Sequence, residues 1–338
     1  MILVTGGAGY IGSHCVLALL EKGIEVVIFD NLSTGHIETV KKLSKYGKIE
    51  FFQGDLQNKD DVKKIFDAFD IEGVIHFAAN SLVAESVVNP QKYYFNNVYG
   101  TLNLLEGMLE HKVKKIVFSS TAATYGEPLY NPIDENHPQN PINPYGQSKL
   151  IVERILDDYA KAYDLRSVRL RYFNVAGADS MTRIGEWHNV ETHLIPNILK
   201  STFNKGKIFE MFGNDYPTKD GTCVRDYINI EDLVEAHLLA LKYLNTGGQT
   251  CFFNLGTKEG DSVKDVFKVC ESVCKQAIPV KIMPRRQGDP SSLVADNTKA
   301  KEILGWSPKK TLIKTVESAY NWEQKLQIEE IKNFKECK

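Results

Sequence analysis

The 338-residue sequence lacks a long apolar run, a paired-cysteine motif and the usual histidine motifs of metal sites. No stretch approaches the ~20 apolar residues of a membrane span. The first residues, MILVTGG, already have the pattern of a strand entering a turn, so no signal peptide is expected. The six cysteines include no CxxC pair, which indicates free thiols in a reducing compartment. The eight histidines form neither HxH nor HExxH. We therefore expect a cytoplasmic protein without a metal site.

The sequence also lacks an excess of either charge. It carries 41 basic and 43 acidic residues, for a formal net charge of −2, and the two signs are interspersed. Such a balance argues against a nucleic-acid-binding or membrane-binding surface. An anionic ligand must therefore be bound by a few well-placed arginines.

Strand-like and helix-like segments alternate through the first half of the chain. Short runs rich in β-branched and apolar residues occur at 1–5, 25–30, 49–52, 73–77, 115–120 and 167–172. Helical patterns separate them, notably around 92–111 and 146–163. This alternation predicts an α/β fold with a doubly wound parallel sheet.

After about residue 175 the pattern loosens, and Pro, Gly and Asn cluster at 174–197 and 213–222. We assign residues 1–175 to a nucleotide-binding domain, to which the chain returns around 224–256. Residues 176–338 are expected to form a smaller C-terminal α/β domain that binds the substrate.

A glycine-rich turn, GGAGYIG, joins the first strand to the first helix. Gly6, Gly9 and Gly12 permit a tight turn and let the backbone approach a pyrophosphate at the helix N-terminus. Asp30 ends the second strand, where it can accept hydrogen bonds from a ribose diol and repel a 2′-phosphate. Together these residues predict a Rossmann-type site for NAD rather than NADP. Asp55, just past the third strand, is either a surface turn residue or a partner of the adenine amino group.

Tyr145 and Lys149 are four residues apart at the start of a predicted helix, so their side chains share one face. A nearby ammonium favours the phenolate form of a tyrosine, which can then act as a general base for an alcohol proton. Thr121 ends the run SST at the carboxyl end of a strand and offers a hydroxyl to the same substrate oxygen. Over a bound NAD, these three residues are typical of alcohol oxidation by hydride transfer.

At this point the sequence resembles the extended short-chain dehydrogenases, and within them the UDP-galactose 4-epimerases. The resemblance covers nearly the whole chain, and its most specific strings are SSTAATYGE, NPYGQSK, LRYFNVAGA, FGNDYPTKDGTCVRDYI and PRRQGD. It implies NAD-dependent interconversion of UDP-glucose and UDP-galactose through a transient 4-keto sugar, with Tyr145 as the base. Tyr145, Lys149 and Thr121 would then be the catalytic residues.

The resemblance also implies the binding residues. The cofactor would contact Gly6, Gly9, Tyr10, Ile11, Gly12, Asp30, Asn31, Asp55, Leu56, Phe77, Ala78, Asn96, Tyr145, Lys149 and Tyr172. The UDP-sugar would contact Thr121, Asn174, His193, Leu194, Phe212, Arg225, Arg286, Asp289 and Leu293. Within that set the two arginines would bind the diphosphate, Asp289 the uridine ribose and Phe212 the uracil. Arg286 as an ordinary surface arginine is the alternative.

Several positions depart from close relatives. Ser81 stands where some carry a lysine near the cofactor ribose, and His193 replaces an asparagine. Leu293 stands where a larger or smaller residue gates the sugar pocket, or else it only packs within its strand. Ala122 and Ala123 fill the places of the Asp–Glu pair that relatives need to eliminate water. Two alternatives stay open: a 4-epimerase for another UDP-sugar, such as an N-acetylated one, and a non-catalytic NAD-binding regulator.

A homodimer is also expected. The helical segments 92–111 and 146–163 carry more apolar side chains than one sheet face needs, among them Val98, Leu102, Leu105, Ile151 and Ile155. The family pairs these two helices from each subunit in a four-helix bundle.

Overall fold

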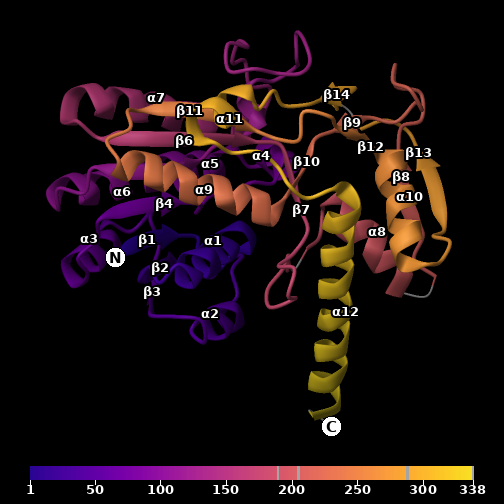
Figure 1. The fold of residues 1–338 in the computed structure, drawn as a ribbon, viewed down its shortest axis with the longest axis horizontal. Coiled ribbons are helices and arrows are strands. Elements are labelled where there is room, and N and C mark those ends of the chain that lie inside the picture. The colour runs from indigo at the N-terminus through magenta and orange to yellow at the C-terminus, as the bar shows by residue number, and fades with distance from the viewer. Residues whose placement is uncertain (189, 204–205, 287–288, 337–338) are drawn as a thin grey trace.

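A seven-stranded parallel sheet forms the centre of the larger part of the molecule (Figure 1). The computed structural model describes residues 1–188, 190–203, 206–286 and 289–336. In chain order the strands of this sheet are β1 (Ile2–Thr5), β2 (Val26–Asp30), β3 (Ile49–Gln53), β4 (Gly73–His76), β5 (Lys115–Ser119), β6 (Arg166–Tyr172) and β11 (Cys251–Leu255). Their spatial order is β11-β6-β5-β4-β1-β2-β3, and each pair is parallel. The predicted doubly wound fold is confirmed.

Alternate residues of each strand serve two separate cores. In β1, Ile2 and Val4 face one core, whereas Leu3 faces the other. Successive side chains of a strand point to opposite faces, so each face needs its own helical cover. The first core is covered by α1 (Tyr10–Glu21), α2 (Ile37–Leu43), α9 (Ile230–Asn245) and α11 (Thr298–Leu304). The second is covered by α3 (Lys59–Ala68), α6 (Gly100–Glu110) and α7 (Pro144–Tyr163).

The helix expected at 92–111 is not one continuous α-helix. It consists of α5 (Pro90–Tyr93), a π-helical segment η1 (Tyr94–Tyr99) and α6, and a short α4 (Val83–Val88) precedes it. Within the π-helical segment the Asn97 amide donates to the Asn80 carbonyl and to the Ser148 hydroxyl, both at 3.0 Å. These bonds tie the loop after β4 to α7. Local widening of a helix often accompanies functional sites.

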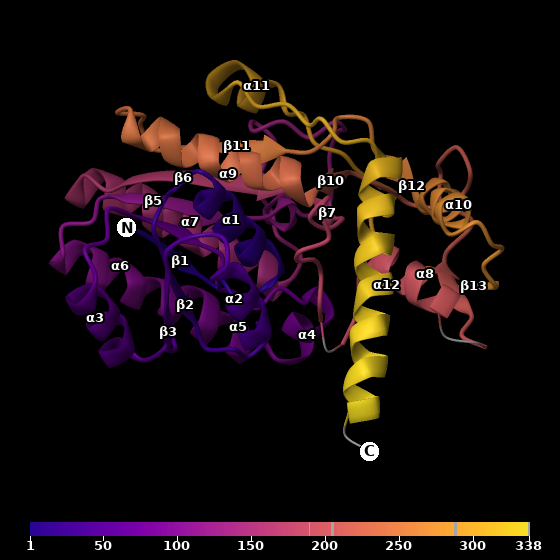
Figure 2. The same cartoon turned by 60° about the horizontal axis from the view of Figure 1, so that its bottom comes forward.

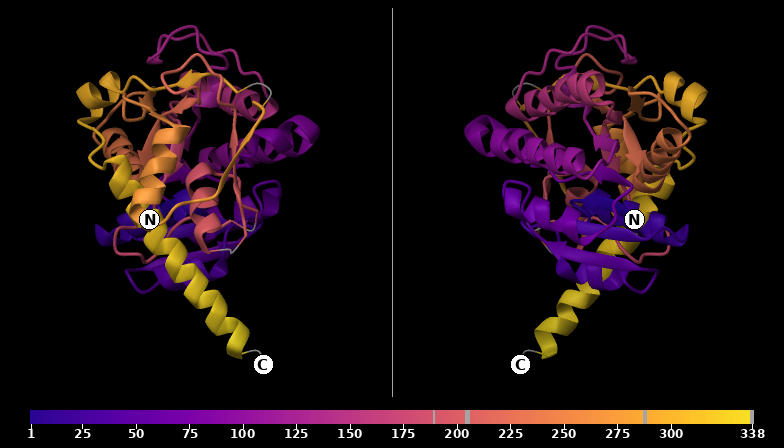
Figure 3. Two further views of the ribbon diagram at one scale, coloured as in Figure 1. Left: turned by 90° about the vertical axis from the view of Figure 1, so that its right-hand side faces the viewer. Right: turned by 90° about the vertical axis from the view of Figure 1, so that its left-hand side faces the viewer.

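The smaller part of the molecule is built from short strands and three helices (Figures 1 and 2). Its strands are β7 (Asn174–Ala176) with β10 (Tyr227–Asn229), β8 (Phe209–Phe212) with β13 (Val280–Met283), and the set β12 (Asp261–Ser262), β9 (Val224–Arg225) and β14 (Ser292–Leu293). Helices α8 (Leu194–Phe203), α10 (Val263–Cys274) and α12 (Leu312–Glu336) pack around a third core. Both views of Figure 3 show α12 projecting beyond the rest of the molecule.

Helix α9 and strand β11 bring the chain back to the large sheet after the first small strands. Leu233 and Ala236 of α9 are buried beside α1, and β11 pairs with β6. Across the ranges described here, no helix has the length and apolar character that a membrane span requires.

Candidate active site

A large cavity of about 870 Å³ lies at the carboxyl edge of the sheet. After β3 the chain crosses to the other side of β1, so β1 and β4 are neighbours whose following loops diverge. In open α/β sheets this divergence creates the crevice in which ligands bind. Residues expected at the cofactor and residues expected at the substrate line the same cavity.

The glycine turn is shaped as the sequence predicts. Gly6 has φ +71°, a conformation that side chains disfavour. A β-carbon on Gly12 would lie 2.1 Å from the Gly6 carbonyl oxygen, so only glycine allows the turn to close against α1. Gly9 is the N-cap of α1 and provides no side-chain cap. The first amides of the helix therefore remain available for an anion, as a dinucleotide pyrophosphate requires.

Asp30 and Asp55 sit at the end of the cavity nearest that turn. The Asp30 carboxylate accepts from the amides of Ala8 (2.9 Å) and Leu32 (2.8 Å). Burial raises the pKa of Asp30, and the two amide bonds oppose this rise. Each oxygen keeps a further lone pair for a ribose hydroxyl. Asp55 accepts from the Asn31 side chain at 3.0 Å, which fixes both residues at the cavity wall.

Tyr145 and Thr121 meet above the end of β5. Thr121 is buried at the N-cap of a 3₁₀ turn, η2 (Ala122–Thr124), and Tyr145 lies in the first turn of α7. Burial raises the pKa of Tyr145 above its usual value, and the hydrogen bond with Thr121 offsets only part of this rise. The bond therefore lowers the cost of forming the phenolate, which is the form that accepts a proton.

Lys149 lies one turn further along α7, but its ammonium is directed toward β5. Its Nζ donates to the Ser119 carbonyl at 2.7 Å and lies 4.8 Å from the centre of the Phe118 ring. Burial lowers the Lys149 pKa to about 7, and the charge of Glu153 opposes this shift. In this structure the hydroxyl of Thr121, and not the ammonium of Lys149, is the group that lowers the Tyr145 pKa, against the larger rise caused by burial.

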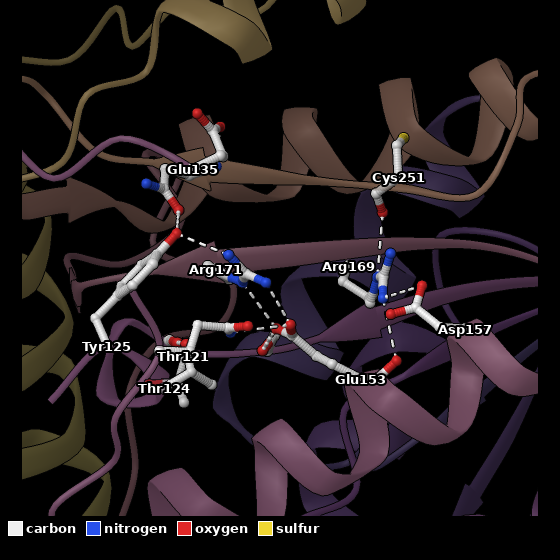
Figure 4. Close-up of polar contacts among 12 residues, drawn as sticks. Thr121, Thr124, Tyr125, Glu135, Glu153, Asp157, Arg169, Arg171 and Cys251 are labelled. Carbon is white, nitrogen blue, oxygen red and sulfur yellow. Dashed lines mark hydrogen bonds and ion pairs between the residues drawn. The ribbon is translucent and has the colours of Figure 1, made fainter. Parts of the chain in front are cut away.

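A buried polar network lies behind α7 (Figure 4). The Glu153 carboxylate accepts from Arg171 and from the Ser120 hydroxyl, which precedes Thr121. Arg171 also donates to the Tyr125 hydroxyl at 2.8 Å. The network fixes β6 and the start of η2 against α7, and so fixes the strand end that carries Thr121. The sequence analysis did not identify it.

Arginines lie at the opposite end of the cavity. Arg225 is 9% exposed, and its guanidinium lies 3.5 Å from the Asp289 carboxylate. Leu293 is paired with Arg225 in the register of β14 and β9, so the two residues lie side by side at the wall. The Arg286 guanidinium lies 4.1 Å from the centre of the Phe212 ring. Two arginines at one end suit a diphosphate, because a guanidinium binds phosphate oxygens in a bidentate manner.

The structure gathers most, but not all, of the predicted site residues. Every residue expected at the cofactor lines the cavity, as do Thr121, Asn174, His193, Arg225, Arg286, Asp289 and Leu293. Phe212 and Leu194 are not part of the lining. Phe212 stands behind Arg286, and Leu194 packs against the core of the smaller part. Their expected substrate contacts therefore stay predictions. Ser81, one of the noted departures, does line the cavity.

One side-chain cluster at the cavity rim was missed. It consists of Glu186, His188, Glu191 and His193, each of which offers one potential ligand atom, and these atoms all lie within 4.8 Å of one another. Burial lowers the pKa of each histidine, but contacts with the two carboxylates more than offset this and raise them to about 9 for His188 and about 10 for His193. The spacing ExHxxExH, read in the sequence, would have revealed the cluster. Our expectation of no metal site was based on the absence of HxH and HExxH, and neither motif describes this cluster.

The chain is similar to known proteins over nearly its whole length. Residues 3–319 match the family model described as GDP-mannose 4,6 dehydratase. A UDP-glucose 4-epimerase of Halalkalibacterium halodurans is 52% identical over 96% of this chain and 95% of that protein. A crystal structure of a UDP-glucose 4-epimerase has a TM-score of 0.92, with 50% identity over 96% of this chain and 97% of that one. That of the Bifidobacterium longum enzyme with NAD⁺ and UDP has a TM-score of 0.91, with 38% identity over 96% and 98%.

Proposed function

The chain belongs to the UDP-glucose 4-epimerases, and we propose that Tyr145 is the base of its reaction. The reaction is the NAD-dependent epimerisation of UDP-glucose and UDP-galactose at C4. The observation that carries the assignment of the base is the hydrogen bond between Tyr145 and Thr121 at the carboxyl edge of the sheet. It lowers the cost of forming a phenolate within the cavity that also contains the glycine turn.

Each residue of the pair has a defined role. The Tyr145 phenolate removes the proton from O4 of the sugar, while Thr121 donates a hydrogen bond that stabilises the charge. The glycine turn and Asp30 would hold NAD, which would supply the acceptor for the C4 hydride and its later return to the opposite face of the ring. Lys149 supplies positive charge one helical turn away and, on leaving the Ser119 carbonyl, can donate to a cofactor hydroxyl. The proton and the hydride both return, so no net oxidation occurs.

Ala122 and Ala123 favour epimerisation over dehydration, although the matching family model is named for a dehydratase. Elimination of water requires an acid beside the sugar to protonate the leaving hydroxyl. Both alanines line the cavity and carry no ionisable group. The keto sugar formed at this site therefore lacks the acid that would divert it to elimination.

The substrate is held by its nucleotide end. Arg225 and Arg286 bind the diphosphate, Asp289 binds the uridine ribose, and Asn174 binds near the diphosphate or the sugar. The binding free energy is thereby spent far from C4, so that the sugar ring stays free to rotate and present either face. Asp30 fixes the cofactor as NAD, because its carboxylate would repel a 2′-phosphate.

We further infer a cytoplasmic homodimer. The rings of Phe95 and Tyr99 lie 5.8 Å apart on η1 and are 53% and 39% exposed. The neighbouring Leu102 and Ile151 are half-buried, whereas Val98 and Ile155 are half-buried and pack against the second core. Leu105, which the sequence analysis placed on this surface, is instead fully buried in the second core. An apolar surface across η1, α6 and α7 suits association of two copies in a four-helix bundle.

An activity measurement tests the proposed function. The purified protein, given UDP-galactose without added cofactor, should yield UDP-glucose at a rate that Tyr145→Phe largely abolishes. Equal turnover in the wild type and the variant would assign the base to another residue. Accumulation of free reduced cofactor would instead identify a net dehydrogenase.

A further inference from the structure

We propose that Glu186, His188, Glu191 and His193 bind one zinc-type divalent cation beside the cofactor turn. The four residues belong to the segment that leads into α8. Each offers one ligand atom, and these atoms all lie within 4.8 Å of one another. His188 and His193 line the same cavity as the catalytic residues, but Tyr145, Lys149 and Thr121 take no part in the cluster.

The distances within the cluster match a tetrahedral ion. Glu186 Oε1 lies 3.3 Å from His188 Nδ1 and 2.8 Å from His193 Nδ1. The two oxygens of Glu191 lie 2.9 Å from His193 Nδ1 and 3.6 Å from His188 Nδ1. Ligand atoms that bind zinc tetrahedrally at 2.0–2.1 Å are about 3.3 Å apart. The four separations, from 2.8 to 3.6 Å, lie on both sides of that value, and all the ligand atoms lie within 4.8 Å of one another.

Three of these atoms are buried without a hydrogen bond, which gives a second and independent indication of a ligand. Glu186 Oε1, His188 Nδ1 and Glu191 Oε2 find no hydrogen-bond partner among the described residues. The Glu186 and Glu191 side chains are each only 6% exposed. The other oxygen of Glu191, Oε1, accepts from the amide and the Nδ1 of His193, at 2.8 and 2.9 Å. An unpaired buried carboxylate oxygen is costly, and a cation removes that cost.

The donor set selects the class of cation. Two imidazole nitrogens and two carboxylate oxygens suit zinc or a similar first-row divalent ion, whereas magnesium and calcium prefer oxygen ligands alone. With neutral imidazoles the two carboxylates balance the +2 charge. Four protein ligands also complete the tetrahedron, which is the arrangement of a structural zinc site and not of a catalytic one.

The cluster is already held in place by its neighbours. Trp322 Nε1 donates to the Glu186 carbonyl at 2.8 Å, and the Trp187 ring stacks on His36 at 3.9 Å. The His188 ring stands edge-on to Tyr10, the first residue of α1, at 6.3 Å. Since His188 and His193 line the cavity, a cation here fastens its wall to the glycine turn and to α12.

An ion-pair cluster without metal is the competing interpretation. Protonated His188 and His193 would then balance Glu186 and Glu191, with Lys200 3.9 Å from Glu191. That arrangement satisfies the charges but leaves the three buried atoms without directed partners. A bound divalent cation balances the carboxylate charges and also gives the three buried atoms a partner.

The experiment uses the untagged protein with its bound cofactor. After chelator treatment and desalting, it is titrated with zinc by calorimetry and, separately, with cobalt(II) by visible spectroscopy. We expect one zinc per chain and the intense visible bands of tetrahedral cobalt with nitrogen and oxygen ligands. Mass spectrometry of metals should find the zinc retained after exhaustive dialysis.

Two variants complete the test. Glu191→Gln combined with His188→Gln should abolish the cobalt bands and reduce zinc affinity by more than about 100-fold, because losing two ligands should cost more than losing an outer-shell partner. His111→Gln removes a histidine that pairs with Asp67 elsewhere, and it should bind zinc as the wild type does. Absence of zinc uptake by the wild type, or equal uptake by the double variant, would overturn the proposal. Circular dichroism of the double variant establishes that it is folded.

Discussion

The carboxylate of Glu153 and the guanidinium of Arg171 form a doubly hydrogen-bonded ion pair in the interior, each side chain only 3% exposed (Figure 4). Burial raises the pKa of Glu153, but the bond and the charge of Arg171 more than offset this and hold it below its usual value. Glu153 lies one turn beyond Lys149 on α7 and accepts from the hydroxyl of Ser120, the neighbour of Thr121. It therefore connects the stability of the sheet to the placement of the catalytic hydroxyl.

Removing one member of this pair should be strongly destabilising. Arg171→Leu leaves the Glu153 carboxylate buried without its partner, and breaking such pairs costs about 3–5 kcal/mol. Denaturant unfolding at pH 7 measures the loss. Lys63→Ala, which breaks the exposed pair with Asp67, should cost less than about 1 kcal/mol. Similar losses of stability in the two variants would show that burial does not increase the contribution of the Glu153–Arg171 pair.

The same pair predicts a pH dependence. Because the folded-state pKa of Glu153 is depressed, its stabilisation is present above the unfolded pKa, ordinarily about 4.3, and is lost as pH falls through the folded value. The stability of Glu153→Leu/Arg171→Leu should therefore fall less than that of the wild type below pH 4. Parallel curves for the two proteins would contradict this assignment.

Tyr145→Phe should reduce turnover by about 10²–10⁴-fold, because it removes the proton acceptor and little else. Binding of NAD and UDP should stay nearly unchanged, since neither requires the phenol oxygen. Tyr163→Phe, at the far end of the same helix and 48% exposed, is the matched control. Turnover by UDP-sugar assay and UDP binding by calorimetry separate a chemical defect from a folding defect.

Thr121→Val should produce a smaller loss of turnover than Tyr145→Phe, with a more alkaline pH profile, because the bond that lowers the Tyr145 pKa is absent.

Asp30→Ala should weaken NAD binding by about 10- to 100-fold, as expected for loss of a charged acceptor. It should also reduce the preference for NAD over NADP, because the repulsive carboxylate is gone. Asp60→Ala, an exposed acid at the start of α3, provides the control. Fluorescence titration with NAD and with NADP gives the ratio of the two affinities. An unchanged ratio would mean that another residue excludes the 2′-phosphate.

Sequence patterns were sufficient for some parts of this molecule and insufficient for others, for physical reasons. The glycine turn and the Tyr145–Lys149 pair are local, because neighbouring residues fix their geometry. The direction of Lys149 toward Ser119 depends on β5, and the Glu153–Arg171 pair joins a helix to a strand 18 residues later. The π-helical segment contains Asn97, whose bonds to a loop and to α7 are not encoded by any local periodicity.

Phe95→Glu combined with Tyr99→Glu should convert a dimer to a monomer. The two exposed rings lie on η1, which packs against α7, and two buried charges at an apolar interface are unfavourable. Light scattering at micromolar concentration measures the mass. Leu129→Glu replaces an apolar residue that is 75% exposed elsewhere, and it should leave the mass unchanged. A monomeric wild type would refute the predicted homodimer.

Leu293 should control whether an N-acetyl group at C2 of the sugar is accepted. The residue is half-buried in β14, is paired with Arg225 and lines the cavity, so its side chain lies close to the diphosphate that Arg225 binds. Steric overlap at a pocket wall is costly, whereas an unfilled gap loses only a few contacts. Leu293→Tyr should therefore suppress activity on UDP-N-acetylglucosamine far more than on UDP-glucose, and Leu293→Ala should do the reverse. Val294→Ala, the next residue but not part of the cavity lining, should change both activities equally. Parallel changes in both Leu293 variants would mean that Leu293 only packs within its strand.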